Sequence, residues 1–130
     1  MSDLDTTAIA RGAGTAAAVA LPAAVVQNLV SEGSSLRSLL FLVIAAGFGL
    51  GGWVAGRARP ARAMTHGGLA ALLGYAGVLV VSILVRVARG AGLALAGVPL
   101  TALIALSCGV IGGYVAYRQA QTGSQAEVSP

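Results

Sequence analysis

Four long runs without a charged residue divide this sequence, and they constrain its fold more than any other feature. The runs cover residues 12–31, 38–56, 63–85 and 90–117, and are 20, 19, 23 and 28 residues long. A helix needs about 20 apolar residues to cross the hydrocarbon core of a bilayer. Only 9% of all residues are charged, against about 25% in soluble domains. The sequence therefore predicts one all-α domain, a bundle of four transmembrane helices. The lipid bilayer that surrounds the helices is its expected partner.

Turn-forming and polar residues place the predicted spans at about 12–31, 37–56, 67–86 and 98–118. A polar connection is expected at 31–35, and Pro60 interrupts the basic segment at 57–62. Pro22 is expected to kink the first span unless neighbouring helices satisfy the freed carbonyl. Pro99 suits the first turn of the fourth helix. The polar residues 119–130 predict a disordered C-terminal tail.

The arginines are distributed unevenly between the two ends of the predicted bundle. Five lie at the end that carries both termini and the 57–66 loop, and these are Arg11, Arg57, Arg59, Arg62 and Arg118. Three lie at the other end, Arg37, Arg86 and Arg89. Because positive residues concentrate on the cytoplasmic side, we expect a multi-pass protein of the cytoplasmic membrane with both termini inside. The arginines flank apolar runs and form no single basic surface, so nucleic-acid binding is not expected.

Glycines spaced four residues apart recur in the second and fourth spans. They form the pairs Gly47/Gly51, Gly52/Gly56 and Gly109/Gly113, and Gly112 adds a further position. Small residues at this spacing let transmembrane helices approach closely, so that dispersion and Cα–H···O contacts hold them together. We interpret these seven glycines as helix-packing positions within one bundle. The alternative is an interface with a second copy or with a larger membrane protein.

The ends of the second and fourth spans resemble each other. The segments GGWVAGR (51–57) and GGYVAYR (112–118) match at five of seven positions and lie 61 residues apart. This match raises the hypothesis of a tandem repeat of two helical hairpins. A chance match is the alternative, because the chain is rich in glycine and alanine.

Aromatic and basic residues follow one another at the end of both spans. Trp53 precedes Arg57, and Tyr114 precedes Arg118. Aromatic rings and arginines are typical of the membrane–water interface. We therefore predict that these four residues anchor the cytoplasmic end of the bundle.

Few residues in the chain offer reactive chemistry. Cys108 and His66 are the only cysteine and histidine, and the four acidic residues lie outside the apolar runs. Without a catalytic constellation, a phosphate-binding loop or a metal-ligand cluster, we expect no enzyme, no cofactor and no metal. An ion-coupled carrier is also disfavoured, because such carriers hold an ionisable group in the membrane. His66 is expected to be a solvated residue at a helix start, with pH sensing as the alternative.

The stretch GGWVAGRARPARAMTHGGLAALLGY (51–75) resembles an uncharacterised family of small four-helix membrane proteins of Gram-positive bacteria. The family pattern combines a glycine-rich end of helix two, a basic loop, a His-Gly start of helix three and a Gly-Gly near the end of helix four. The matching positions are Gly51, Gly52, Gly56, His66, Gly67, Gly112 and Gly113. The resemblance implies an architecture and a bacterial source, and no activity.

Two functional hypotheses follow from these features. The first is a non-catalytic accessory or structural subunit that acts through helix–helix contacts, because small-residue stripes occur without buried ionisable groups. The second is a homo-oligomeric channel or carrier for a small neutral or anionic solute, with Arg57 and Arg118 at its entrance.

Overall fold

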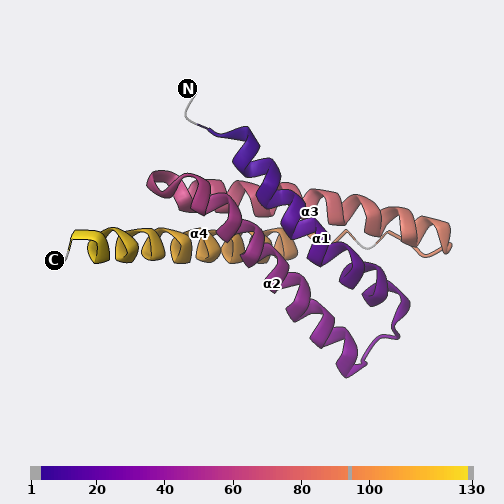
Figure 1. Cartoon of the computed structure of the whole chain (residues 1–130). Coiled ribbons are helices and arrows are strands. Elements are labelled where there is room, and N and C mark those ends of the chain that lie inside the picture. The colour runs from indigo at the N-terminus through magenta and orange to yellow at the C-terminus, as the bar shows by residue number, and fades with distance from the viewer. Residues whose placement is uncertain (1–3, 94, 129–130) are drawn as a thin grey trace.

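A computed structural model describes residues 4–93 and 95–128, and within these ranges the chain forms four long α-helices and no strand (Figure 1). The helices are α1 (Thr6–Leu29), α2 (Ser35–Ala58), α3 (Ala63–Ala88) and α4 (Val98–Val128). A 3-10 turn, η1 (Pro60–Arg62), precedes α3. All four helices are long and apolar enough to cross a membrane. The predicted all-α, four-helix architecture is confirmed.

The helices form two antiparallel hairpins, α1–α2 and α3–α4, which cross each other (Figure 1). Helices α2 and α3 are both central, because each contacts the other three helices. Helix α1 also contacts α3, but α1 and α4 do not touch within the described residues. In a tandem repeat, α1 would correspond to α3 and α2 to α4. Two symmetrically packed hairpins would therefore have a contact between α1 and α4 that matches the one between α3 and α2. The hairpins are therefore packed unequally, and the tandem repeat stays a hypothesis.

Local hydrogen bonds explain where the first two helices begin. The Asp5 carboxylate accepts a hydrogen bond of 3.1 Å from the backbone N–H of Ala8, so α1 begins at Thr6. The hydroxyl oxygen of Ser34 accepts one of 3.3 Å from the N–H of Leu36 and caps α2. Such side chains satisfy N–H groups that have no partner inside the helix. Pro22 lies inside α1, which continues through it to Leu29.

The C-terminal tail differs from the prediction of disorder for residues 119–130. Helix α4 continues to Val128, and residues 129–130 lie outside the described part of the chain. The amide of Gln121 donates to the Tyr117 hydroxyl at 2.6 Å, and the Thr122 hydroxyl donates to the Arg118 carbonyl at 3.0 Å. A helix of 31 residues is about 46 Å long, longer than a bilayer core of about 30 Å. The polar tail is thus a helical extension of the last span.

The core of the bundle consists almost entirely of small residues. Among the described residues, the only buried apolar side chains larger than alanine are Ile44, Phe48 and Val78. The outer surface carries the large aliphatic side chains, such as Leu42 and Leu100, each 63% exposed. Lipid solvates leucine well, so only close packing and hydrogen bonds favour contact between helices. This distribution is the one expected for helices that meet inside a membrane.

Direct backbone contacts between glycines set the distance between α2, α3 and α4. A Cβ atom placed on Gly52 would lie 2.7 Å from Cα of Gly109, and one on Gly67 would lie 3.1 Å from Cα of Gly113. A Cβ on Gly56 would lie 3.0 Å from the same Gly113 atom. We refer to Gly52, Gly56, Gly67, Gly109 and Gly113 as the glycine junction. No side chain larger than hydrogen fits there without moving a helix.

The other predicted packing glycines lie on both sides of the junction. A Cβ on Gly51 would lie 2.5 Å from the carbonyl oxygen of Gly12, and one on Gly47 would lie 3.1 Å from Cβ of Val19, so both face α1. A Cβ on Gly112 would lie 2.9 Å from the backbone nitrogen of Trp53. All seven predicted packing glycines are buried, and α2 uses different glycines for α1 and for α4.

His66 is fully buried and joins the start of α1 to the start of α3. Its Nε2 accepts a hydrogen bond of 3.1 Å from the backbone N–H of Asp5, and its Nδ1 lies 3.0 Å from the carbonyl oxygen of Arg62. A neutral ring with the proton on Nδ1 satisfies both contacts. The prediction of a solvated His66 is wrong, because α1 begins before residue 12 and its first turn covers the ring.

Replacing Gly52 by alanine tests the glycine junction. The added methyl group would overlap the Gly109 backbone, so we expect the free energy of unfolding to fall by about 1–3 kcal/mol. Thermal unfolding in detergent micelles, followed by the fluorescence of the single tryptophan, Trp53, measures this change.

The matched control is Gly77→Ala in α3, where an added Cβ would meet nothing within 4 Å. Its stability should stay within about 0.5 kcal/mol of the wild type. Equal stability of the two alanine variants would contradict the contact between α2 and α4.

The Asp5 carboxylate makes the stability of the N-terminal end depend on pH. The Ala8 N–H, and then Arg59, whose Nε lies 3.3 Å from Oδ2, hold the pKa of Asp5 below its ordinary value of 3.8. The ionised carboxylate therefore stabilises the folded chain above that value, and this contribution is lost as the pH falls through the lowered pKa. Asp5→Asn should still cap α1 and should lower the unfolding midpoint at about pH 7. The difference between the two unfolding temperatures should shrink as the pH falls through the lowered pKa of Asp5. A difference in unfolding temperature that stays the same at every pH would argue against the ionised Asp5 carboxylate as its cause.

Candidate functional site

The predicted anchors lie where α2 ends beside α4, which continues beyond them to Val128. The guanidinium carbon of Arg57 lies 4.6 Å from the centre of the Trp53 ring, in cation–π geometry. The indole N–H of Trp53 donates to Oε1 of Gln119 at 2.9 Å, which ties the end of α2 to α4. Tyr114 and Arg118 are exposed on α4. These contacts suit a membrane interface.

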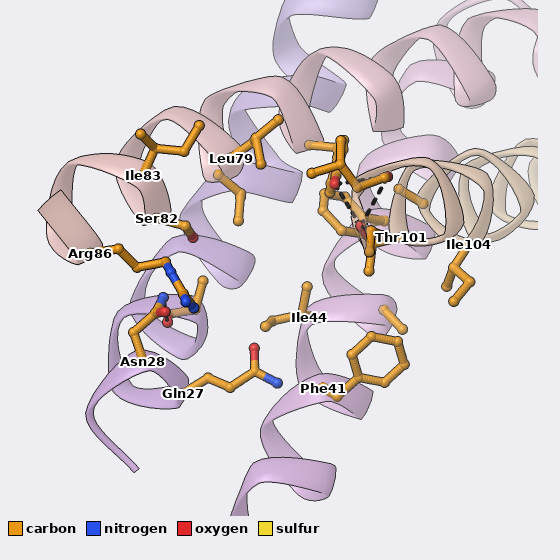
Figure 2. A pocket seen from close by; sticks show the side chains of 18 of the residues that line it. Gln27, Asn28, Phe41, Ile44, Leu79, Ser82, Ile83, Arg86, Thr101 and Ile104 are labelled. Atoms are coloured by element: carbon orange, nitrogen blue, oxygen red, sulfur yellow. Dashed lines mark hydrogen bonds between the residues drawn. The ribbon is translucent and has the colours of Figure 1, made fainter. Parts of the chain in front are cut away.

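A cavity of about 250 Å³ lies in the other half of the bundle, between all four helices (Figure 2). Each helix contributes to its wall, and the lining side chains include Asn28 from α1, Phe41 and Ile44 from α2, Leu79 and Ser82 from α3, and Thr101 and Ile104 from α4. Leu93 and Leu95, from the segment between α3 and α4, also line it. An engineered apolar cavity of about 150 Å³ holds benzene in another protein. This cavity is therefore large enough for part of an organic molecule.

Two aromatic rings and the glycine junction close the inner end of the cavity. Phe48 and Tyr75 meet edge to face, with ring centres 6.1 Å apart and planes at 69°. Both rings line the cavity. Beyond them along α2 come Gly52 and Gly56, where the backbones touch. The cavity thus ends inside the bundle, where the helices come closest.

Polar groups on the cavity wall are fixed by neighbouring backbone. The Tyr75 hydroxyl lies 2.6 Å from Oγ1 of Thr101 and donates to the carbonyl oxygen of Val98 at 3.2 Å. The Gln27 amide donates to the carbonyl oxygen of Arg37 at 3.4 Å, which links the ends of α1 and α2. The bonds of Tyr75 fix the wall near the inner end of the cavity, and the bond of Gln27 fixes its mouth, where a neutral polar group could bind.

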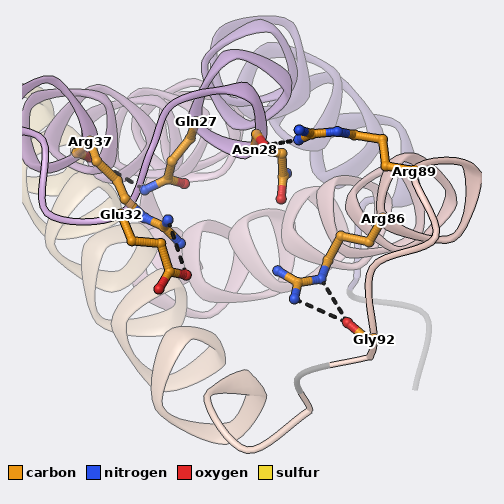
Figure 3. Close-up of polar contacts among 7 residues, drawn as sticks. All are labelled: Gln27, Asn28, Glu32, Arg37, Arg86, Arg89 and Gly92. Atoms are coloured by element: carbon orange, nitrogen blue, oxygen red, sulfur yellow. Dashed lines mark hydrogen bonds and ion pairs between the residues drawn. The ribbon is translucent and has the colours of Figure 1, made fainter.

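The outer end of the cavity meets a second, polar pocket of about 250 Å³, and Asn28 and Arg86 line both (Figure 3). Nε and Nη2 of Arg86 both donate to the carbonyl oxygen of Gly92, at 3.2 and 3.0 Å. Arg89 donates through Nη1 to the carbonyl oxygen of Asn28. Arg37 pairs with Glu32 at 3.5 Å. The site therefore has an apolar interior and a positively charged end.

The sequence did not predict this cavity. The third span contains the polar residues Tyr75 and Ser82, and the first span contains Gln27 and Asn28 near its end. The sequence does not show that these four residues line the same cavity, because that depends on how the two hairpins cross. The polar pair Gln27–Asn28 in an otherwise apolar span was the best available signal.

Comparison with protein-family models, curated protein sequences and solved structures finds no match to this chain. Within residues 4–93 and 95–128, no three His, Cys, Asp or Glu side chains lie close enough to hold a metal ion. The walls of the cavity offer apolar contact, hydrogen bonds and arginine.

Tyr75→Phe tests the hydrogen bonds that hold α3 against the start of α4. Loss of the hydroxyl leaves Thr101 its bonds to the Gly97 and Val98 carbonyls, so the expected cost is only about 1 kcal/mol. Tyr114→Phe, at a position 45% exposed, is the control and should unfold like the wild type. Thermal unfolding of the three proteins compares them. A Tyr75→Phe variant as stable as Tyr114→Phe would show that these bonds do not stabilise the bundle.

Proposed function

We propose that this chain is a non-catalytic integral membrane protein that acts by binding an amphipathic molecule in the cavity between its four helices. The observation that carries the proposal is the cavity itself, apolar inside and polar at its mouth. Binding sites for organic molecules are mostly apolar, with a few polar groups that orient the ligand. A site that opens beside a membrane meets amphipathic molecules first.

The glycine junction favours binding over conduction through one copy of the chain. A pore needs a continuous path between the two ends of the bundle. At Gly52, Gly67 and Gly109 the backbones of three helices are in contact, which leaves no such path along their shared axis. A homo-oligomeric channel would need its path between copies, so it is the weaker alternative.

The arginine distribution supports an orientation for this binding site. With five arginines at the end that carries the termini and three at the other, the positive-inside rule favours termini in the cytoplasm. The cavity mouth would then lie in the outer leaflet.

The accessory-subunit hypothesis has its own supporting observation. A wide apolar groove runs over the outer surface between α2 and α4, lined by small residues such as Ala46, Gly49 and Cys108 together with Leu50 and Ile111. Small residues at a helix surface allow close approach of another transmembrane helix. A second copy of the chain bound there would appear as a dimer in native mass spectrometry.

Filling the cavity tests the binding proposal. Ala24 is 3% exposed and lines the cavity, so Ala24→Leu should displace the ligand. Native mass spectrometry of protein released from native membrane discs should show an added mass on the 12.7 kDa chain, and the variant should lose it. The leucine side chain would fill the cavity and make new packing contacts. The ligand-free Ala24→Leu variant should therefore unfold at the same temperature as the wild type or at a higher one.

The control is Ala18→Leu, on the exposed face of α1, which should keep the bound mass. A wild-type chain released without any bound molecule would contradict the proposal. Equal ligand content in the two leucine variants would do the same.

A further inference from the structure

Positive charge is in excess at the cavity mouth. The described residues there include three arginines, Arg37, Arg86 and Arg89, and one acid, Glu32. The Glu32 side chain is 91% exposed and lies 3.5 Å from Arg37, so it compensates that arginine. Within the described part of the chain, neither Arg86 nor Arg89 forms an ion pair. Two charges at this end are therefore uncompensated by protein.

The position of Arg86 connects this charge with the apolar cavity. Arg86 lies in the last turn of α3 and lines both the cavity and the polar pocket. Its guanidinium group points toward Asn28 and the space between α1 and the segment after α3 (Figures 2 and 3). A molecule could therefore lie with its apolar part between Ile44 and Leu79 and its polar end at Arg86.

Arg86 and Arg89 retain donors for such a polar end. A guanidinium group has five N–H donors, and Arg86 directs Nε and Nη2 to the Gly92 carbonyl. The remaining N–H groups can donate to a ligand while these bonds hold the side chain in place. Arginine binds phosphate and carboxylate oxygens through pairs of parallel hydrogen bonds.

We propose that the molecule held in the cavity is an anionic amphiphile, with a phosphate or carboxylate headgroup bound by Arg86 and Arg89. Its apolar chain enters the cavity, and its headgroup lies in the polar pocket beside Asn28. This inference rests on the proposed function and adds the charge of the ligand and the residues that recognise it.

The test compares lipids that share their chains and differ in headgroup. The full chain in zwitterionic detergent micelles is titrated with phosphatidylglycerol, phosphatidylcholine or uncharged diacylglycerol, and bound lipid is counted by native mass spectrometry. Phosphatidylglycerol should bind at least about tenfold more tightly than diacylglycerol, because hydrogen bonds to charged groups are strong. Salt should weaken binding of the anionic lipid and leave diacylglycerol unaffected.

Arg86→Gln removes the charge and keeps a side-chain amide that can donate to the Gly92 carbonyl. This variant should lose the preference for phosphatidylglycerol and still bind diacylglycerol. Arg118→Gln, at the opposite end of the bundle, is the matched control and should keep the preference. A preference unchanged in Arg86→Gln would overturn the assignment of the headgroup site.

Two further outcomes separate the inference from the function on which it rests. Equal binding of all three lipids, abolished by Ala24→Leu, would reject the anionic headgroup and keep the binding function. No binding of any lipid would reject both. Inorganic phosphate and glycerol phosphate are added as competitors. If they bind at Arg86 as tightly as the lipid does, the ligand is a soluble anion and the amphiphile proposal fails.

Discussion

Contact between glycine backbones determines how the four helices of this chain are arranged. In a membrane, apolar side chains gain little by leaving lipid, so helices associate through dispersion and hydrogen bonds at short range. Glycine has no side chain and so allows the closest approach of two helix backbones. At Gly52, Gly67 and Gly109 the backbones lie so close that only hydrogen atoms fit between them. The leucines and valines that would form the core of a soluble bundle face outward instead. The rest of the structure follows from this arrangement, with small residues in the core and large aliphatic residues on the outside.

Helices that touch at one point and cross must separate on either side of it. At the end that carries the termini, His66 and the Trp53–Gln119 pair join the helices. At the other end, larger side chains such as Phe41, Ile104 and Arg86 line an open space. The cavity therefore results from the same close packing that holds the bundle together, and its charged mouth results from arginines that end the helices.

Sequence patterns were sufficient for the architecture and insufficient for the site. The lengths of the charge-free runs gave four spans, and the spacing of Gly52, Gly109 and Gly113 marked surfaces that are buried. The helical tail was missed because polar composition alone does not exclude a helix that side chains such as Gln121 support. The burial of His66 and the cavity beside Tyr75 were missed because both depend on contacts between residues far apart in the chain. The hydrogen bond between Asp5 and His66, for example, joins residues 61 positions apart.

The contact between α2 and α4 can be measured directly by nuclear magnetic resonance of the selectively glycine-labelled chain in micelles. With a Cβ on Gly52 only 2.7 Å from Cα of Gly109, the Hα protons of these two glycines must lie close together. We expect a strong Hα–Hα nuclear Overhauser effect between them, and another between Gly56 and Gly113. The absence of both, in spectra that resolve sequential contacts of the same glycines, would contradict the glycine junction and the cavity that depends on it.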